Sequence, residues 1–237
     1  EKGYYDFSEF LSKHFPYKVQ KISINAGFTC PNRDGSKGTG GCTYCNNQTF
    51  NPDYCKPVMS VAEQLEKGTA FFARKYPQMK YLAYFQAYTN TYATVSYLER
   101  IYKEAIQEPD IKVLSIATRP DCLPEETLDL LERINKQKPV WVELGLQTIH
   151  KSSSDFIRRG YELDVFEKAV YDLKKIGIHV IVHTILCLPG ETTEIILGGD
   201  IHLTQPIVFG APSVNPTPAP TRSEEATAGN FILDLNG

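Results

Sequence analysis

Five apolar segments alternate with amphipathic segments along most of the chain, and this alternation limits the fold more than any other feature of the sequence. The apolar segments are short and rich in β-branched and aromatic residues, which is typical of strands. The segments between them repeat apolar residues every three or four positions, which is the period of a helix. We expect strands at 18–26, 80–88, 111–119, 140–148 and 179–189, and helices at 60–75, 95–107, 124–137 and 164–177.

This order predicts an α/β fold with a parallel sheet and right-handed crossovers. The last strand, in the stretch HVIVHTILCLP, is apolar almost throughout, which suits a strand buried on both faces. An open doubly wound sheet and a partial barrel both satisfy the pattern. Because both architectures bind ligands at the carboxyl ends of their strands, functional residues are expected just after each strand.

Three of the six cysteines lie close together after the first predicted strand, in the stretch CPNRDGSKGTGGCTYC from Cys30 to Cys45. Cys42 and Cys45 are spaced as a chelating pair. The glycine-rich segment between Cys30 and Cys42 must fold back if all three sulfur atoms are to meet, and its glycines permit that path. The stretch therefore predicts a tight loop around a bound group.

Two kinds of metal site fit these cysteines. A structural zinc ion needs four ligands, and Cys55 is the available fourth thiol. A [4Fe–4S] cluster held by only three thiolates leaves one iron open to an outside ligand, which favours catalysis over simple electron transfer. Disulfides are the weaker explanation because a core of this size does not need them. A phosphate-binding P-loop is disfavoured because the Gly-Lys-Ser/Thr order is absent.

Several ordered motifs resemble the radical S-adenosylmethionine (SAM) superfamily, and most closely a bacterial subgroup similar to the elongator catalytic subunit. The motifs are GFTCPNRDGSKGTGGCTYCN, YLAYFQAYTNTYA, ATRPDCLP, WVELGLQT, IRRG and LPGET. The resemblance implies a partial (β/α) barrel of radical SAM type with a [4Fe–4S] cluster and SAM as cofactors. It also implies reductive cleavage of SAM to a 5′-deoxyadenosyl radical that abstracts hydrogen from an unknown substrate.

The resemblance further implies a set of site residues. Cys30, Cys42 and Cys45 would be the cluster ligands, and Tyr44 would lie near the adenine. The remaining cofactor contacts would come from strand ends or the segments after them, and they are Gln86, Thr89, Thr118, Gln147, Arg159 and His183. No residue is assigned to the hydrogen abstraction itself.

Glu143, in WVELGL, is a carboxylate in an otherwise apolar strand. Two interpretations stay open for it. Its side chain faces the barrel interior as a functional group, or it pairs structurally with Arg119 or a nearby lysine.

The carboxyl-terminal part of the chain departs from the family pattern. We expect a radical SAM core over 1–197, with the cluster loop at 27–47, and a Gly/Pro/Ser-rich tail over 198–237 that is loop or disordered. The barrel would then be incomplete at its carboxyl-terminal end. It would also expose an apolar edge beside the fifth strand, which is a hazard for aggregation.

Composition adds little about partners. The net charge of −3 gives no sign of a polyanion-binding surface, so a nucleic-acid substrate follows only from the likeness to elongator-like proteins, which act on transfer RNA. A reductant such as flavodoxin or ferredoxin is the expected electron donor. No membrane span or signal peptide is recognised, so we expect a cytoplasmic protein. The competing hypotheses are a zinc-stabilised binding module with Cys30, Cys42, Cys45 and Cys55 as ligands, and an inactive truncated remnant.

Overall fold

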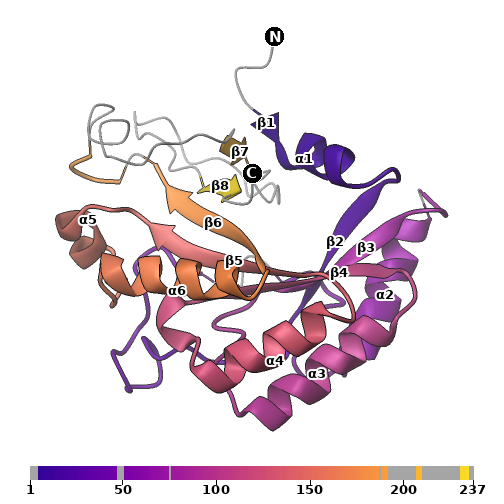
Figure 1. Cartoon of the computed structure of the whole chain (residues 1–237), viewed down its shortest axis with the longest axis horizontal. Helices are drawn as coiled ribbons and strands as arrows, with labels where there is room; N and C mark the ends of the chain where they lie inside the picture. Colours follow the sequence, from indigo (N-terminus) through magenta and orange to yellow (C-terminus); the bar gives the residue numbers. More distant parts are fainter. Residues whose placement is uncertain are drawn as a thin grey trace.

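A computed structural model of the chain describes residues 5–46, 51–74, 76–186, 188–191, 207–209 and 230–234. Its strands form one sheet in the order β1-β7-β8-β6-β5-β4-β3-β2, and most of its helices lie on one face of it (Figure 1). The strands are β1 (Tyr5–Asp6), β2 (Val19–Ile24), β3 (Lys80–Phe85), β4 (Ile111–Thr118), β5 (Val140–Gln147), β6 (His179–Ile185), β7 (Ile207–Phe209) and β8 (Asn230–Asp234). The α-helices are α1 (Phe7–His14), α2 (Val61–Ala73), α3 (Val95–Gln107), α4 (Glu125–Asn135), α5 (Lys151–Phe156) and α6 (Leu163–Lys175), and a 3-10 turn, η2, spans Pro120–Cys122.

Strands β2 to β6 lie side by side in sequence order, and each pairs in parallel with the next. A doubly wound sheet would reverse direction at its middle and place helices on both faces. Here each right-handed crossover leads to the next strand in the same direction along the sheet. Helices α2, α3, α4 and α6 therefore all lie on the outer face (Figure 1). The structure thus confirms the partial barrel.

The predicted elements agree with the structure in kind and mostly in extent. Helix α3 has the predicted bounds, and α2 begins with a capping box in which Ser60 accepts from the Glu63 main chain and Glu63 accepts from that of Ser60. The predicted strands run one to four residues too far, because the apolar pattern continues into the loops that follow. Helices α1 and α5 were not predicted, and both are short.

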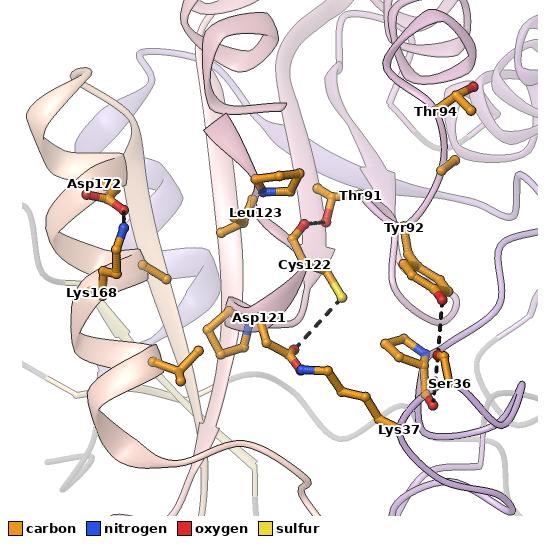
Figure 2. Close-up of a pocket in the computed structure, with 16 residues that line it drawn as sticks. Ser36, Lys37, Thr91, Tyr92, Thr94, Asp121, Cys122, Leu123, Lys168 and Asp172 are labelled. Atoms are coloured by element: carbon orange, nitrogen blue, oxygen red, sulfur yellow. Dashed lines mark hydrogen bonds and ion pairs between the residues drawn. The ribbon is translucent and has the colours of Figure 1, made fainter. Parts of the chain in front are cut away.

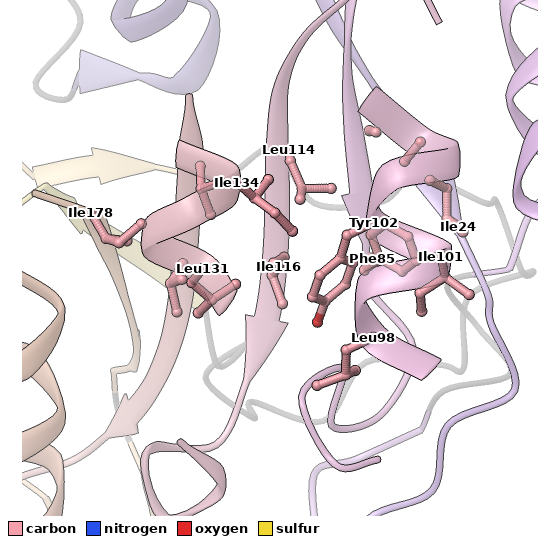
Figure 3. Packing of buried hydrophobic residues seen from close by; sticks show 14 of the residues in the cluster. Ile24, Phe85, Leu98, Ile101, Tyr102, Leu114, Ile116, Leu131, Ile134 and Ile178 are labelled. Atoms are coloured by element: carbon pink, nitrogen blue, oxygen red, sulfur yellow. The ribbon is translucent and has the colours of Figure 1, made fainter. Parts of the chain in front are cut away.

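The main core lies between the sheet and the outer helices. Side chains from strands and helices meet there in one continuous cluster (Figure 3). Leu98, Leu114 and Leu130 are completely buried in it, and each such burial contributes about 1.5–3 kcal/mol to folding. This layer fixes the positions of the strands and therefore of the loops that follow them.

Helix α1 covers part of the concave face of the sheet. Phe10 and Leu11 pack against strand residues that alternate with those of the main core. These strand residues are Leu82, Val113, Trp141 and Ile181. Because side chains two positions apart share a face, the next residues along each strand also face the barrel interior.

That next layer is polar, and Glu143 lies at its centre. Its carboxylate is 2.5 Å from Lys21 Nζ and 2.8 Å from His183 Nε2, and it accepts a hydrogen bond from Ser115 Oγ at 2.5 Å. Burial alone would raise the pKa of Glu143, but Lys21 and His183 outweigh it and hold that pKa below its usual range. The structure therefore shows the predicted pairing of Glu143 with a lysine, which is Lys21. Arg119 pairs with Asp121 instead.

The outer edge of β6 is not exposed. Strand β8 pairs with it antiparallel over Ile181–Ile185, and β7 and β1 continue the sheet. The prediction of an exposed apolar edge was therefore wrong, because strand β8, from the tail, pairs along it. The predicted tail over 198–237 otherwise lies outside the described residues. None of the helices in the described part of the chain is both long and apolar enough to cross a membrane.

Replacement of Glu143 by alanine is expected to lower the free energy of unfolding by about 3–5 kcal/mol, because Lys21 would keep its charge without a partner. Chemical denaturation of the purified protein measures this. The double variant Lys21→Met plus Glu143→Leu should lose less, since it removes both charges. A Glu143→Ala protein as stable as the wild type would contradict the argument.

Acid should weaken the contribution of Glu143. Since its pKa is lower in the folded state than the roughly 4.3 of an unfolded chain, its contribution is present above that pH and is lost as the pH falls toward the folded value. The stability difference between wild type and Glu143→Gln should therefore be largest near pH 7 and shrink below about pH 4. Glu126→Gln, at an exposed position on α4, serves as the matched control.

Candidate functional site

The cysteine-rich loop follows β2 and folds back on itself. The Cys30 carbonyl accepts hydrogen bonds from the main chain of Arg33 and Asp34, at 2.8 and 3.1 Å. The return path is held by Gly41, whose N–H donates to the Asn32 carbonyl at 2.8 Å. Gly41 has a φ of +80°, which a glycine adopts at little cost. The fold-back that the glycines predicted is therefore present.

Asn32 connects this loop to the turn after α5. Its side chain is buried and donates to the carbonyls of Arg158 and Arg159, at 2.7 and 3.2 Å. The same amide lies 3.4 Å from the sulfur of Cys42. A Cβ on Gly160 would lie 2.7 Å from Asn32 Oδ1, so the glycine of the IRRG motif is needed for this approach. Two motifs far apart in sequence thus form one unit.

Cys30, Cys42 and Cys45 are all partly buried thiols that take part in no disulfide. Burial raises the pKa of Cys42, and hydrogen bonds from Asn32 and Tyr44 oppose that rise. Among the described residues, no three or more His, Cys, Asp or Glu side chains are gathered tightly enough to hold a metal ion. The donor set still fits an iron–sulfur cluster, because three thiols on one loop are the ligands that such a cluster takes.

Tyr44 lies in the cysteine loop, between Cys42 and Cys45 in the sequence. It is 41% exposed, and its hydroxyl hydrogen-bonds Cys42. The structure thus places Tyr44 beside a predicted ligand, and its contact with adenine stays a prediction.

Cys55 has a different environment. It is 2% exposed, and its sulfur lies 3.8 Å from Asn51 Oδ1. Burial raises the pKa of its thiol to about 12. Cys55 is therefore a buried apolar residue here.

An ion-pair network fastens the cysteine loop to the end of β4. Arg119 binds both carboxylate oxygens of Asp121 at 2.9 Å, and Lys37 of the loop binds the same carboxylate at 2.6 Å. The Asp121 side chain is 5% exposed; burial would raise its pKa, but Arg119 and Lys37 lower it. Arg119 also donates to the Arg159 carbonyl at 2.9 Å. Arg119 and Asp121 together therefore link three loops.

A cavity of about 750 Å³ lies beside this network (Figure 2). One wall is the cysteine loop, with Ser36 and Lys37, and the opposite wall is α6, with Lys168 and Asp172. The loops after β3 and β4 close the remaining sides. Ser36 Oγ and the Tyr92 hydroxyl lie 3.1 Å apart, so the loop is held at this side as well.

Three of the predicted cofactor contacts, Gln86, Thr89 and Thr118, lie at or just after the ends of the neighbouring strands β3 and β4. Gln86 accepts from Ser23 Oγ at 2.8 Å, and the main chain of Thr89 donates to the Thr29 carbonyl at 3.2 Å. Thr118 Oγ1 lies 2.6 Å from Thr91 Oγ1. All three lie at the edge from which the cysteine loop extends, so the structure brings them near it. Their contacts with SAM stay predictions.

The other three differ from one another. His183 points to Glu143, in the layer below, and its side chain is 26% exposed. Gln147 ends β5 with a φ of +65°. Arg159 is 2% exposed and makes four hydrogen bonds of 2.6–3.1 Å to the carbonyls of Leu146, Thr148 and Tyr161. Most of the donors of Arg159 are therefore engaged by the main chain, as expected of a structural residue.

Three residues other than glycine have a positive φ, and all lie at this edge of the described structure. They are Tyr88, Gln147 and Arg158, with φ between 54° and 65°. Such backbone conformations cost free energy and are concentrated at functional sites. The strained main chain agrees with the location of the candidate site.

The sequence did not single out Asn32, Arg33 or Asp121, and it named Arg119 only as a candidate partner of Glu143, although all four lie inside the quoted motifs. The sequence did contain a signal for this ion-pair network. Arg119 and Asp121 follow a strand end, and Lys37 lies in the glycine-rich loop. Lys21 was also missed. A lysine on the polar face of an alternating strand normally faces solvent, so nothing local in the sequence marked Lys21 as the partner of a buried carboxylate.

Comparison with known proteins gives consistent results. The model of the radical SAM superfamily matches residues 29–197. The uncharacterised protein YtqA of Bacillus subtilis is 37% identical over 197 residues, which cover 83% of this chain and 61% of that protein. The protein YhcC of Escherichia coli K12 is 41% identical over 182 residues, which cover 76% of this chain and 58% of that protein. The chain thus spans about three-fifths of the length of these relatives.

The fold resembles a solved structure as well. Archaeal Elp3 from Methanocaldococcus infernus, with an amino-terminal deletion, has a TM-score of 0.51 and 19% identity, and the match covers 76% of this chain and 40% of that one. At this identity the likeness concerns the fold alone. Since the family model matches most of the chain, from the start of the cysteine loop to beyond β6, the chain belongs to the radical SAM superfamily.

Proposed function

We propose that this protein is a radical SAM enzyme that holds a [4Fe–4S] cluster through Cys30, Cys42 and Cys45 and binds SAM beside it. The observation that carries the proposal is the separation of the cysteines. Three partly buried thiols lie on one loop, while Cys55 is buried elsewhere with a thiol pKa raised to about 12. A three-thiol set leaves an iron site for an outside ligand, whereas a zinc site would need the fourth thiol.

When bound, the cluster and SAM would together supply a 5′-deoxyadenosyl radical through one-electron cleavage of the sulfonium. The residues of the chain would hold these groups and orient the cysteine loop around them. Asn32 donates toward Cys42, and Lys37 and Arg119 hold the loop through Asp121. Helix α1 covers the far part of the concave face with Phe10 and Leu11, so water has less access from that end.

The substrate and electron donor belong to the same proposal. An RNA substrate is supported by the likeness to elongator-like proteins, and the net charge of −3 adds nothing to it. A small redox protein such as flavodoxin or ferredoxin is the proposed donor.

Anaerobic reconstitution with iron and sulfide should give about four irons per chain and a brown absorbance. Cys42→Ala should lose most of the iron, because it removes a ligand from the only thiol set on the loop. Cys55→Ala is the matched control and should keep the iron. One tightly bound zinc per chain, lost in both variants, would instead support the zinc-stabilised module.

Reconstituted protein with SAM and dithionite is expected to form 5′-deoxyadenosine, measured by chromatography. Cys42→Ala should form none above background. The same assay with unfractionated transfer RNA tests the substrate class, since a substrate should increase the yield. Iron-loaded protein that forms no 5′-deoxyadenosine would contradict the proposed activity and favour an inactive protein.

A further inference from the structure

Arg33 is a second arginine inside the cysteine loop, and it has no role in the function proposed above. Its main-chain N–H closes the turn on the Cys30 carbonyl at 2.8 Å. Its side chain reaches across the loop, where Nη2 donates to the Cys45 carbonyl at 2.7 Å. Arg33 therefore connects the two ends of the segment that carries all three predicted ligands.

The guanidinium of Arg33 still has donors to offer. Its Nε atom is buried and has no hydrogen-bond acceptor among the residues that the structure describes. A buried N–H without an acceptor costs about 1–3 kcal/mol, so such a group is normally satisfied by something else. Arg119 and Arg159, by contrast, each make four hydrogen bonds to a carboxylate or to carbonyls.

The surroundings of Arg33 keep this donor in place. A Cβ on Gly41 would lie 2.7 Å from the guanidinium, so a larger residue at this position would displace the arginine side chain. The ring of Tyr88, a residue with a positive φ, lies 5.7 Å below the guanidinium.

We propose that Arg33 is a positioning residue whose free Nε–H binds an anionic acceptor at the cysteine site. The inference rests on the proposed function. Two acceptors share this chemistry: a thiolate or sulfide sulfur of the cluster, and the carboxylate of SAM. A fixed positive charge beside the cluster stabilises its reduced, more negative state and so raises its reduction potential. A charged hydrogen bond to the carboxylate instead strengthens SAM binding.

The test compares reconstituted wild type, Arg33→Gln and Arg33→Lys, with Arg100→Gln as a charge-matched control. Arg100 lies on α3 with a side chain that is 64% exposed. Redox titrations followed by electron paramagnetic resonance give the midpoint potential without SAM, and equilibrium dialysis gives the SAM dissociation constant. Near-UV circular dichroism of each apoprotein checks that the fold is intact.

If sulfur is the acceptor, Arg33→Gln should shift the potential to more negative values, and Arg33→Lys should shift it less. If the carboxylate is the acceptor, the potential should stay and the SAM dissociation constant should rise roughly ten-fold or more. Loss of iron in Arg33→Gln but not in Arg33→Lys also supports the proposal, because the variants differ in charge.

The proposal is overturned if neither quantity changes more than in Arg100→Gln, or if both Arg33 variants lose iron equally. Wild-type protein that takes up no iron contradicts the proposed function, and the inference with it. Wild-type protein with a normal cluster and no effect of Arg33 contradicts the inference alone.

Discussion

Parallel pairing of five strands in sequence order is the constraint on which the rest of the molecule depends. Parallel neighbours need a long crossover, and in this order every crossover leaves a helix on the outer face and a loop at the same edge. The cysteine loop and the loops after β3, β4 and β5 are therefore neighbours before any side chain is considered. The polar contacts then determine how the loops are held.

Those contacts have a common design, in which one polar side chain serves several loops. Asn32 contacts both a cysteine and the turn after α5, and Asp121 receives two cations from different segments. Buried ion pairs add little net stability, but removing one partner is costly. Such groups consequently restrict the loops to one arrangement, which suits a site that must hold several ligands in register.

The sequence predicted the repeating features well, because periodicity and end signals are local. Helix α3 and the capping box of α2 are examples. Pairings between distant residues were harder to predict: the partner of Glu143 is Lys21, 122 positions away, and Arg159 is surrounded by carbonyls that no motif reveals. The strand that covers β6 was missed because its pairing depends on the tertiary structure and not on a pattern within 230–234.

Helix α1 has a consequence for how the protein is made. Phe10 packs in one cluster with Ile181, so the first helix meets its last contact only after nearly all of the sheet has been synthesised. At about 5–20 residues per second, that interval is on the order of ten seconds. During it the apolar side of α1 is covered only in part, by Leu82, Val113 and Trp141 as they are added, and contacts so distant in sequence form slowly. Native packing of the first described helix is therefore completed late, after the strands that it covers have paired.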